Sequence, residues 1–294
     1  MYPIIRPEAN NGFGSDSMQV AMIQDKIVPM AELESVHFDR AIYFGDGVYE
    51  VVRSYNGKIF ALEEHLARFA RSLSAIGIVG VDIAQINRRI QKAFDAAGIS
   101  NAKIYFHITR GSGLREHVCG ANIQPNFFLT ITEVGDDTKA KTEGITVSTC
   151  LDLRWKRCDI KSLNLLPNVL ACQDAVKKGC AEAILVDDSG LITEGAASAF
   201  FTILDQALQT ASLTSNILPS ITREFVIEAG KKIRLEIVEE SLTPQQAGGA
   251  DELFIAATTN DIVPVVKFDN VMIGDGKPGK YTKLLIQEFR SFTI

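Results

Sequence analysis

Strand-like and helix-like segments are intermixed along this chain, and their order limits the possible folds more than any other feature of the sequence. Val48–Tyr55 is apolar and β-branched, and Asn56-Gly57 then supplies the positive-φ pair that a tight hairpin turn needs. From Leu62 the apolar residues recur at helical spacing, and Gly77 ends that run. Because strands and helices do not alternate strictly, the sequence predicts α+β domains and not a doubly wound parallel sheet.

The same periods predict further elements on both sides of a central polar segment. Before it we expect strands at residues 18–23, 27–30, 58–60, 103–109 and 127–134, and a second amphipathic helix from 83 that Gly98 closes. After it we expect strands at residues 145–150, 182–186, 199–203, 234–238 and 253–258, and helices at 168–178, 222–229 and 281–289.

That polar segment, residues 136–141, follows neither period and predicts a linker between domains. A chain of 294 residues suggests about two domains. We therefore expect a smaller N-terminal α/β domain at residues 1–135 and a larger C-terminal mixed α/β domain at residues 142–294.

Charge and hydropathy exclude several classes of protein. The 30 Lys and Arg residues against 36 Asp and Glu give a formal net charge of −6, which leaves no basic excess to neutralise the phosphates of a nucleic acid. The sequence has no apolar run of about 18 residues, so we expect no membrane span. Residues 1–16 lack the apolar region of a signal peptide.

The cysteines indicate a reducing compartment. The five cysteines form no C-x-x-C pair, so we expect free thiols and a cytoplasmic protein. With only four histidines besides, we expect no metal site. Neither G-x-G-x-x-G nor G-x-x-x-x-G-K-[ST] occurs, so the common dinucleotide and P-loop sites have no support.

Residues 154–161 are a first candidate for chemistry, with five charges around the only tryptophan. One interpretation is a solvated loop, which is the usual fate of a charge run. The other is that Lys161, which precedes a mixed apolar and polar stretch, is a nucleophile of the Schiff-base type, activated by neighbouring cations and partial burial. The residues alone leave both interpretations open.

Three shorter segments allow a similar choice. Glu194, between small residues, is either a turn carboxylate that faces water or a group that touches the edge of a flat ligand. Ile221-Thr222-Arg223 opens a helix and Thr258-Thr259-Asn260 ends a strand. Both segments could simply cap their elements. Alternatively, the first could offer a phosphate the free amides of a helix N-terminus, and the second a hydroxyl.

Taken together, these segments resemble one family. The motif RWKRCDIKSLNLLPNVLA at residues 154–171 is followed by TEGAAS, SITR and DELFIAATT, and preceded by YFGDGVYEVV and HLAR. In this order and spacing they closely resemble the class IV (fold type IV) pyridoxal-phosphate aminotransferases, over nearly the whole chain from about Asp39. The resemblance implies the two-domain fold type IV architecture and pyridoxal 5'-phosphate as cofactor.

The resemblance also assigns roles to single residues. Lys161 matches the Schiff-base lysine, Glu194 the carboxylate at the pyridine nitrogen, and Arg68 the phosphate-binding arginine. On a helical wheel Arg68 lies about 100° from the centre of the apolar stripe, which suits a side chain that leaves the core towards a cleft. The alternative is an exposed arginine paired with Glu64 at i,i+4. The remaining matches are Leu218 on the ring face, the Ile221 and Thr222 amides at the phosphate, and the Thr258 hydroxyl.

Within the family, the loop after the strand at 103–109 suggests the substrate. Arg115 and His117 match the R-x-H pair with which D-amino-acid aminotransferases bind the substrate α-carboxylate. In that subfamily the pair comes across the interface of a homodimer, beside a tyrosine that matches Tyr49. A guanidinium fork suits a carboxylate because it binds it bidentately. The alternative is a surface loop whose Arg115 and Glu116 face water.

The resemblance therefore implies transamination of D-amino acids, of the D-alanine and D-glutamate type, with 2-oxo acids by a ping-pong mechanism. The partners are small amino and 2-oxo acids and a second copy of the chain. Alternatives are a branched-chain L-amino-acid or (R)-amine transaminase, an aminodeoxychorismate lyase, or a two-domain binding protein without catalysis. Four positions depart from the family's usual residues and leave the substrate range open: Pro167, Ala197, Ala199 and Ser220.

Overall fold

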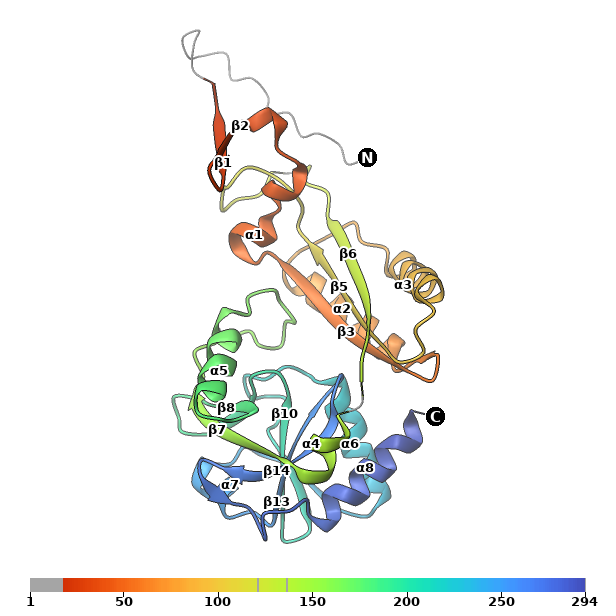
Figure 1. Cartoon of the computed structure of the whole chain (residues 1–294), viewed down its shortest axis with the longest axis vertical. Coiled ribbons are helices and arrows are strands. Elements are labelled where there is room, and N and C mark those ends of the chain that lie inside the picture. Colours follow the sequence, from red (N-terminus) through yellow and green to blue (C-terminus); the bar gives the residue numbers. More distant parts are fainter. Residues whose placement is uncertain (1–17, 121, 136, 294) are drawn as a thin grey trace.

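The chain forms two lobes, one above the other in Figure 1. The computed structural model describes residues 18–120, 122–135 and 137–293. A smaller antiparallel sheet with its helices makes the upper lobe, and a larger mixed sheet with its helices makes the lower one. The predicted α+β class is confirmed by these two sheets, since strands and helices follow one another without strict alternation.

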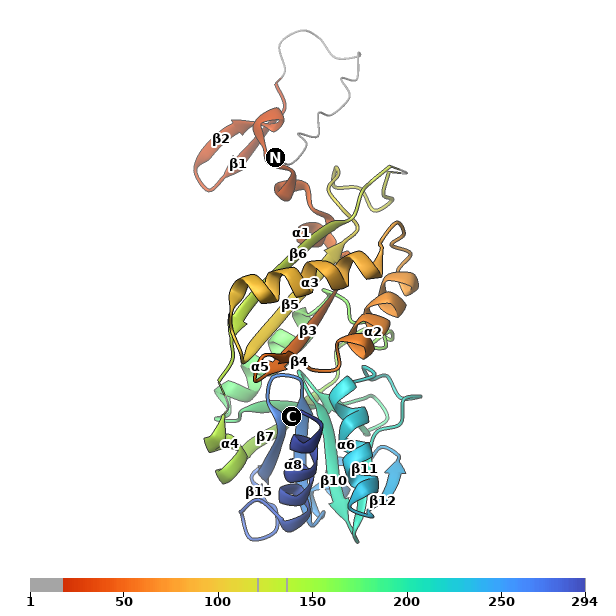
Figure 2. The same cartoon turned by 90° about the vertical axis from the view of Figure 1, so that its right-hand side faces the viewer.

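The small lobe is a four-stranded antiparallel sheet in the order β4-β3-β5-β6. Figure 2 shows the long helices α2 and α3 lying on one face of it. The bounds are α1 Arg40–Phe44, β3 Gly47–Tyr55, β4 Lys58–Ile59, α2 Leu62–Ala75, α3 Ile83–Ala97, β5 Ala102–Thr109 and β6 Asn126–Glu133.

Strand periodicity decides which face of this sheet meets the helices. The fully buried residues of β3 and β5, such as Val48, Val52 and Phe106, share a core with Leu66 and Phe69 of α2. The alternate residues of the same strands point to the opposite face, which turns towards the large lobe. The predicted Asn56-Gly57 turn is confirmed, with φ of 49° and 83°.

A short hairpin projects from the end of the small lobe (Figures 1 and 2). It consists of β1 Val20–Ile23 and β2 Lys26–Pro29, both predicted. Two short 3-10 turns, Met30–Glu32 and Ser35–Phe38, connect it to α1. The expectation about a signal peptide concerns residues 1–16, which lie outside the described residues.

The large lobe is built on a nine-stranded mixed sheet in the order β12-β11-β10-β13-β14-β7-β8-β9, with β15 on β14. Helices α6 and α8 share a core with β10 and β13, and α5 packs against β8. The strands are β7 Ile145–Leu151, β8 Glu182–Val186, β9 Ile192–Gly195, β10 Ala199–Leu204, β11 Ala207–Thr210, β12 Glu236–Glu239, β13 Glu252–Ala257, β14 Asp261–Phe268 and β15 Val271–Met272. The helices are α4 Thr138–Glu143, α5 Leu166–Lys177, α6 Ile221–Lys232, α7 Pro244–Gly248 and α8 Lys280–Phe292.

Two expectations about local structure need adjustment. Within the segment expected to be a linker, residues 138–141 belong to the short helix α4, which Asp137 caps by accepting from the Ala140 amide. The strand expected from residue 234 begins later, at Glu236, because Arg234 has φ +64° and ends the turn after α6. Within the described residues, no helix has the length and apolar character that crossing a bilayer requires.

Candidate active site

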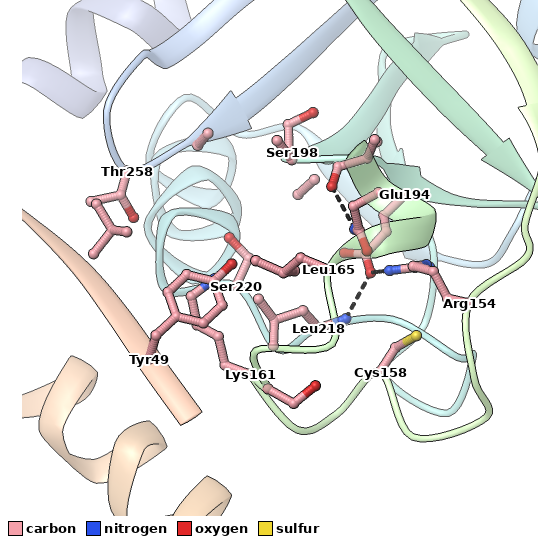
Figure 3. A pocket seen from close by; sticks show the side chains of 18 of the residues that line it. Tyr49, Arg154, Cys158, Lys161, Leu165, Glu194, Ser198, Leu218, Ser220 and Thr258 are labelled. Carbon is pink, nitrogen blue, oxygen red and sulfur yellow. Dashed lines mark hydrogen bonds and ion pairs between the residues drawn. The ribbon is translucent and has the colours of Figure 1, made fainter. Parts of the chain in front are cut away.

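A pocket of about 580 Å³ lies between the two lobes, and its size suits a small-molecule site. One wall comes from the outward face of the small-lobe sheet, and the other from the large lobe. Figure 3 shows side chains from both lobes pointing into the same space. Six of the ten residues assigned from the family resemblance line this pocket: Tyr49, Arg68, Lys161, Glu194, Leu218 and Thr258.

The assigned residues outside the lining fall into two groups. Ile221 and Thr222 are buried at the start of α6, directly after Ser220, which does line the pocket, so their assigned role rests on their backbone amides. Arg115 and His117 lie elsewhere on the small lobe and do not line this pocket.

Lys161 is held in place by the small lobe, although it lies in the segment between β7 and α5. Its amide donates to Ser72 Oγ (3.2 Å), and its carbonyl accepts from the Tyr49 amide (3.0 Å). Ser162 continues this contact as an isolated bridge to Val48 of β3. The backbone of Lys161 therefore runs along β3 like a short extra strand, which fixes where the side chain starts.

The Lys161 amine lies against Tyr49. Its Nζ is 3.3 Å from the Tyr49 hydroxyl and 4.3 Å from the centre of the ring. The loop interpretation of residues 154–161 is therefore wrong for Lys161, whose side chain enters the pocket. Cys158 also lines the pocket, but burial raises the pKa of its thiol to about 11, so it is protonated at neutral pH and is not a competing nucleophile.

Glu194 is a buried carboxylate at the end of β9, 6% exposed, and not a turn residue in water. Its Oε1 accepts from the Arg154 guanidinium and from the Leu218 amide (3.0 Å). Burial raises the pKa of Glu194, and the charge of Arg154 only partly offsets this. Arg154 is fixed in turn by Asp152, 2.8 Å away. Figure 3 shows Glu194 between Arg154 and Leu218.

Arg68 of α2 reaches the pocket from the small lobe, as the helical wheel predicts. The alternative pairing with Glu64 is wrong. Its partner is Glu50 of β3, which it binds with two parallel hydrogen bonds of 2.7 Å, while Nη1 donates to the Pro219 carbonyl (2.8 Å). This bidentate pair joins α2 to β3 and sets the guanidinium beside the residues that precede α6.

The carboxylate of that pair is strongly stabilised in its charged form. Burial alone would raise the pKa of Glu50, but Arg68 and His65 outweigh it and lower the pKa to about 2. His65 Nδ1 lies 2.8 Å from the Glu50 carboxylate. Burial lowers the pKa of His65, so its ring is neutral at pH 7.

The start of a helix and a threonine hydroxyl complete the far end of the pocket. Helix α6 begins at Ile221, and the first amides of a helix have no partner within it, so the Ile221 and Thr222 N–H groups are donors for an anion. Ser220 caps this helix by accepting from the Arg223 amide (3.2 Å). Thr258 follows β13 directly and brings a hydroxyl to the same pocket.

This set of residues fits pyridoxal phosphate. Arg68, the start of α6 and the Thr258 hydroxyl offer a cation and donors for the phosphate. Glu194 offers a buried carboxylate for a protonated ring nitrogen, and the Lys161 amine lies in the same pocket for the aldehyde. No group of three or more His, Cys, Asp or Glu side chains in the described parts of the chain is placed to hold a metal ion.

The sequence matches the family described as Amino-transferase class IV over residues 47–268. This match covers well over half of the chain. The chain belongs to the class IV aminotransferases. It is thus an enzyme of a pyridoxal-phosphate-dependent family, and the predicted family and cofactor are confirmed.

Relatives and solved structures agree with this class IV assignment. The chain is 38% identical over 246 residues to a protein named D-alanine aminotransferase from Bacillus licheniformis, covering 83% of this chain and 87% of the relative. It is 34% identical over 277 residues to one of that name from Staphylococcus haemolyticus, covering 94% and 98%. The fold is similar to the branched-chain amino acid aminotransferase of Escherichia coli, with a TM-score of 0.82, 25% identity and coverage of 91% and 92%. The predicted fold type IV architecture is confirmed.

A second solved structure has a similar fold. The fold is also similar to a branched-chain amino acid aminotransferase from the organism abbreviated T.th., with a TM-score of 0.79, 23% identity and 95% coverage of both chains. That structure is a complex with N-(5'-phosphopyridoxyl)-L-glutamate, a pyridoxal phosphate derivative.

The loop after Glu194 contains two of the positions at which this class IV chain departs from its family. Both line the pocket; Ala197 is exposed, and Ala199 is buried at the start of β10. Glu182 fixes this loop by accepting hydrogen bonds from the Ser198 hydroxyl (2.9 Å) and the Ala197 amide (3.3 Å). Burial raises the pKa of Glu182.

The other two departures have local explanations. Ser220 stands where the family usually has glycine and supplies the side-chain cap of α6. Pro167 lies in the first turn of α5, where the missing N–H of a proline has no intrahelical partner to lose.

Arg115 and His117 lie beside Phe44 of α1. The Arg115 guanidinium is 5.5 Å and the His117 ring 5.4 Å from the centre of the Phe44 ring. Arg40 fixes the backbone of this loop by donating to the Glu116 carbonyl (2.6 Å) and the His117 carbonyl (3.1 Å). Arg115, Glu116 and His117 are all exposed in the single chain, so both the surface-loop alternative and the carboxylate-binding assignment stay open here.

Sequence reasoning did not identify the partners of the assigned residues. In the sequence Arg154 is only one charge in a run, yet it is the ion-pair partner of Glu194. Glu50 lies between Val48 and Val52 on the helix-facing side of β3, and a carboxylate at such a position needs a cationic partner. That pattern, combined with Arg68 on the adjacent helix, was the signal available in the sequence.

Proposed function

We propose that this class IV aminotransferase transfers the amino group of D-amino acids, of the D-alanine and D-glutamate type, to 2-oxo acids in two half-reactions. The observation that carries the proposal is the Arg115-x-His117 pair, in a chain whose relatives at 34–38% identity are named D-alanine aminotransferase. The small amino and 2-oxo acids fit the size of the pocket.

In this proposal Lys161 has two roles. It would hold the cofactor covalently, and its amine, once free, would take up the proton that leaves the substrate Cα. The Tyr49 hydroxyl, 3.3 Å from Nζ, orients this amine. Bound pyridoxal phosphate supplies the electron sink that makes the Cα proton acidic.

Glu194 holds the ring nitrogen in its protonated form. The contacts from Arg154 and Leu218 both end on Oε1, which leaves Oε2 as the acceptor for the ring N–H. A preorganised carboxylate in a buried site stabilises the developing charge more than it would in water. Leu218, whose amide donates to Glu194, would pack its side chain on the ring face.

The phosphate is the anchor in this proposal. Arg68 offers its charge, the Ile221 and Thr222 amides offer the N-terminal donors of α6, and Thr258 offers a hydroxyl. Because Glu50 binds two nitrogens of Arg68, the guanidinium cannot swing away from this position without breaking a buried ion pair.

The α-carboxylate of the substrate is bound by Arg115 and His117 of a second copy, so the enzyme acts as a homodimer. An apolar groove lined by Ile42, Leu153, Trp155 and Leu166 shares Arg154 and Trp155 with the active pocket, and we assign it to the partner's loop. Leu153 and Leu166 are 67% and 68% exposed in the single chain, which favours a partner on this face.

A substitution in this groove tests the dimer. Leu166→Glu places a charge on the proposed interface and is expected to give a monomer by sedimentation, with reduced activity on D-alanine. An unchanged dimer that is fully active would contradict the interface.

The domain boundaries also remain a proposal, with a small domain at residues 1–135, a linker at 136–141 and a cofactor-binding domain at 142–294. We further propose a cytoplasmic location. The five cysteines, which form no C-x-x-C pair in the sequence, favour a reducing compartment.

The D-amino-acid proposal is tested by the first half-reaction alone. The purified enzyme is mixed separately with D-alanine, D-glutamate, L-leucine and (R)-phenylethylamine, and the spectrum of the bound cofactor is followed. We expect conversion by the two D-amino acids. Conversion by L-leucine in preference to both would favour the branched-chain alternative, which the similarity to the Escherichia coli enzyme supports.

A further inference from the structure

A buried charge cluster joins the two lobes next to the active pocket. Its centre is Asp261, the first residue of β14. Asp261 Oδ1 accepts from Arg53 Nη1 (3.1 Å) and from the Tyr55 hydroxyl, and Oδ2 accepts from Lys141 Nζ (2.6 Å). The side chains of Arg53 and Lys141 are 5% and 6% exposed, so these ion pairs are screened little by solvent.

The cluster is attached to a turn that lines the pocket. Strands β13 and β14 pair through Ala257 and Asp261, which leaves Thr258, Thr259 and Asn260 as the hairpin loop. Thr258 and Thr259 both line the pocket. Besides Asp261, Arg53 Nη1 donates to the Thr259 carbonyl at 2.6 Å. Arg53 Nη1, from the small lobe, thus binds both the hairpin loop, at Thr259, and Asp261, the residue that follows the loop.

The turn also has a conformation that needs support. Asp261 has φ +57°, in the left-handed region that Asp tolerates better than most residues. Such a residue often completes a three-residue hairpin loop. Three donors from two other elements, β3 and α4, hold its side chain and so select this conformation.

We propose that Arg53 and Asp261 are positioning residues for the cofactor phosphate. They fix the Thr258–Thr259 turn from the small lobe, so that the Thr258 hydroxyl is set in advance for the phosphate. The inference rests on the proposed role of Thr258. To the proposed phosphate site it adds Arg53 and Asp261, which do not touch the cofactor themselves and act by fixing the Thr258–Thr259 turn.

Two substitutions separate positioning from simple electrostatics. Asp261→Asn removes a negative charge near an anionic ligand, so electrostatics alone predicts tighter phosphate binding. Positioning predicts weaker binding, because the loop loses its anchor. Arg53→Lys keeps the charge but withdraws the donor that Nη1 offers to both Thr259 and Asp261, because the lysine side chain ends one bond earlier, so only positioning predicts an effect.

The experiment compares two ligands of the cofactor-free enzyme, pyridoxal phosphate and pyridoxal, which lacks the phosphate. We expect Asp261→Asn and Arg53→Lys each to raise the Kd for pyridoxal phosphate ~10-fold, as the loss of about one charge-assisted hydrogen bond does, and to change the Kd for pyridoxal less than ~2-fold. An equal loss for both ligands would overturn the inference in favour of general destabilisation. Unchanged or tighter binding of pyridoxal phosphate would also overturn it.

Asp269→Asn is the matched control. Asp269 follows the other end of β14, also has positive φ (44°), and accepts from the Thr149 amide and hydroxyl at 2.7 Å, away from the pocket lining. We expect it to leave both Kd values unchanged. If Asp261→Asn does not fold, Arg53→Lys decides the question by the same criteria.

Thr258→Val separates failure of this inference from failure of the proposed site. If Thr258→Val weakens pyridoxal phosphate but not pyridoxal, the role of Thr258 stands, whatever the cluster variants do. In the double variant Thr258→Val/Asp261→Asn the two losses should then be less than additive, because Asp261 acts through Thr258. Full additivity would overturn the inference while leaving the phosphate site intact.

Discussion

At the scale of single residues, the chemistry depends on one of two lysines in the pocket. Lys161 and Lys103 both line it, but Lys161 is the one placed against Tyr49. We expect Lys161→Ala to abolish transamination and covalent attachment of the cofactor while the fold survives, because the variant lacks the amine for both steps. Borohydride reduction and peptide mapping of the wild type, with Lys103→Ala as control, test this. A label on Lys103 would contradict the assignment.

Glu194 supports a second prediction at this scale. Glu194→Gln keeps an acceptor for the Leu218 amide but removes the charge that faces the ring nitrogen. We expect the cofactor to stay bound and kcat to fall on the order of 10²-fold, as for other preorganised electrostatic groups. Single-turnover kinetics with a Cα-deuterated substrate measures whether proton removal has become slower. A wild-type kcat would show that this carboxylate has no catalytic role.

Arg68 shows which features of a site residue can be predicted from the sequence. The helical wheel predicted that Arg68 leaves the apolar stripe towards a cleft, because helical geometry is local. Its partner was not predictable in the same way. Glu64 is the neighbour along the helix, but Glu50 is the neighbour in space, and the packing of α2 on β3 decides between them.

At the scale of elements, the contact between β3 and α2 makes stability depend on pH. The pKa of Glu50 is about 2 in the folded chain against 4.5 for a free carboxyl, so the pair stabilises the fold above about pH 4.5 and this contribution is lost as pH falls towards 2. At pH 7 we expect Glu50→Gln to lower the free energy of unfolding by roughly 3 kcal/mol, and near pH 2 the difference should vanish.

Denaturant unfolding at several pH values checks this, with Glu64→Gln, an exposed carboxylate of the same helix, as the control. A difference between wild type and Glu50→Gln that does not change with pH would contradict the titration of Glu50.

Elements with a clear period or an apolar run were predicted, whereas several short or interrupted elements were not. Strand β9 has only four residues, with Thr193 and Glu194 at its centre, so it shows neither an apolar run nor a period. Strand β14 contains Pro264, which normally argues against a central strand, yet it lies between β13 and β7. The register with β7 is irregular just after it, between Val265 and Lys267. The short helix α4 depends on the Asp137 cap and is too brief to show a helical stripe.

At the scale of the whole molecule, the proposed active site needs two copies of the chain. Arg115→Ala should raise KM for D-alanine and D-glutamate together, by roughly 1.5–3 kcal/mol for a lost charge-assisted hydrogen bond, because both carry the α-carboxylate. (R)-phenylethylamine lacks that group and should be unaffected. Steady-state kinetics with the three substrates measures this, with the exposed Arg88→Ala on α3 as control. An equal loss on all three substrates would indicate a structural loop.

The position of the pocket between the lobes has a consequence for how the enzyme melts. Each lobe has its own hydrophobic core, and the cofactor site draws residues from both. A ligand that binds only when both cores are intact couples their unfolding, since it stabilises the pair and neither half alone. In a calorimeter we expect the cofactor-free enzyme to show two heat-absorption peaks and the loaded enzyme a single, later one. The vitamin-derived cofactor would thus serve this protein as a source of folding cooperativity as well as a reagent, and a single peak in its absence would show that the two cores are already one unit.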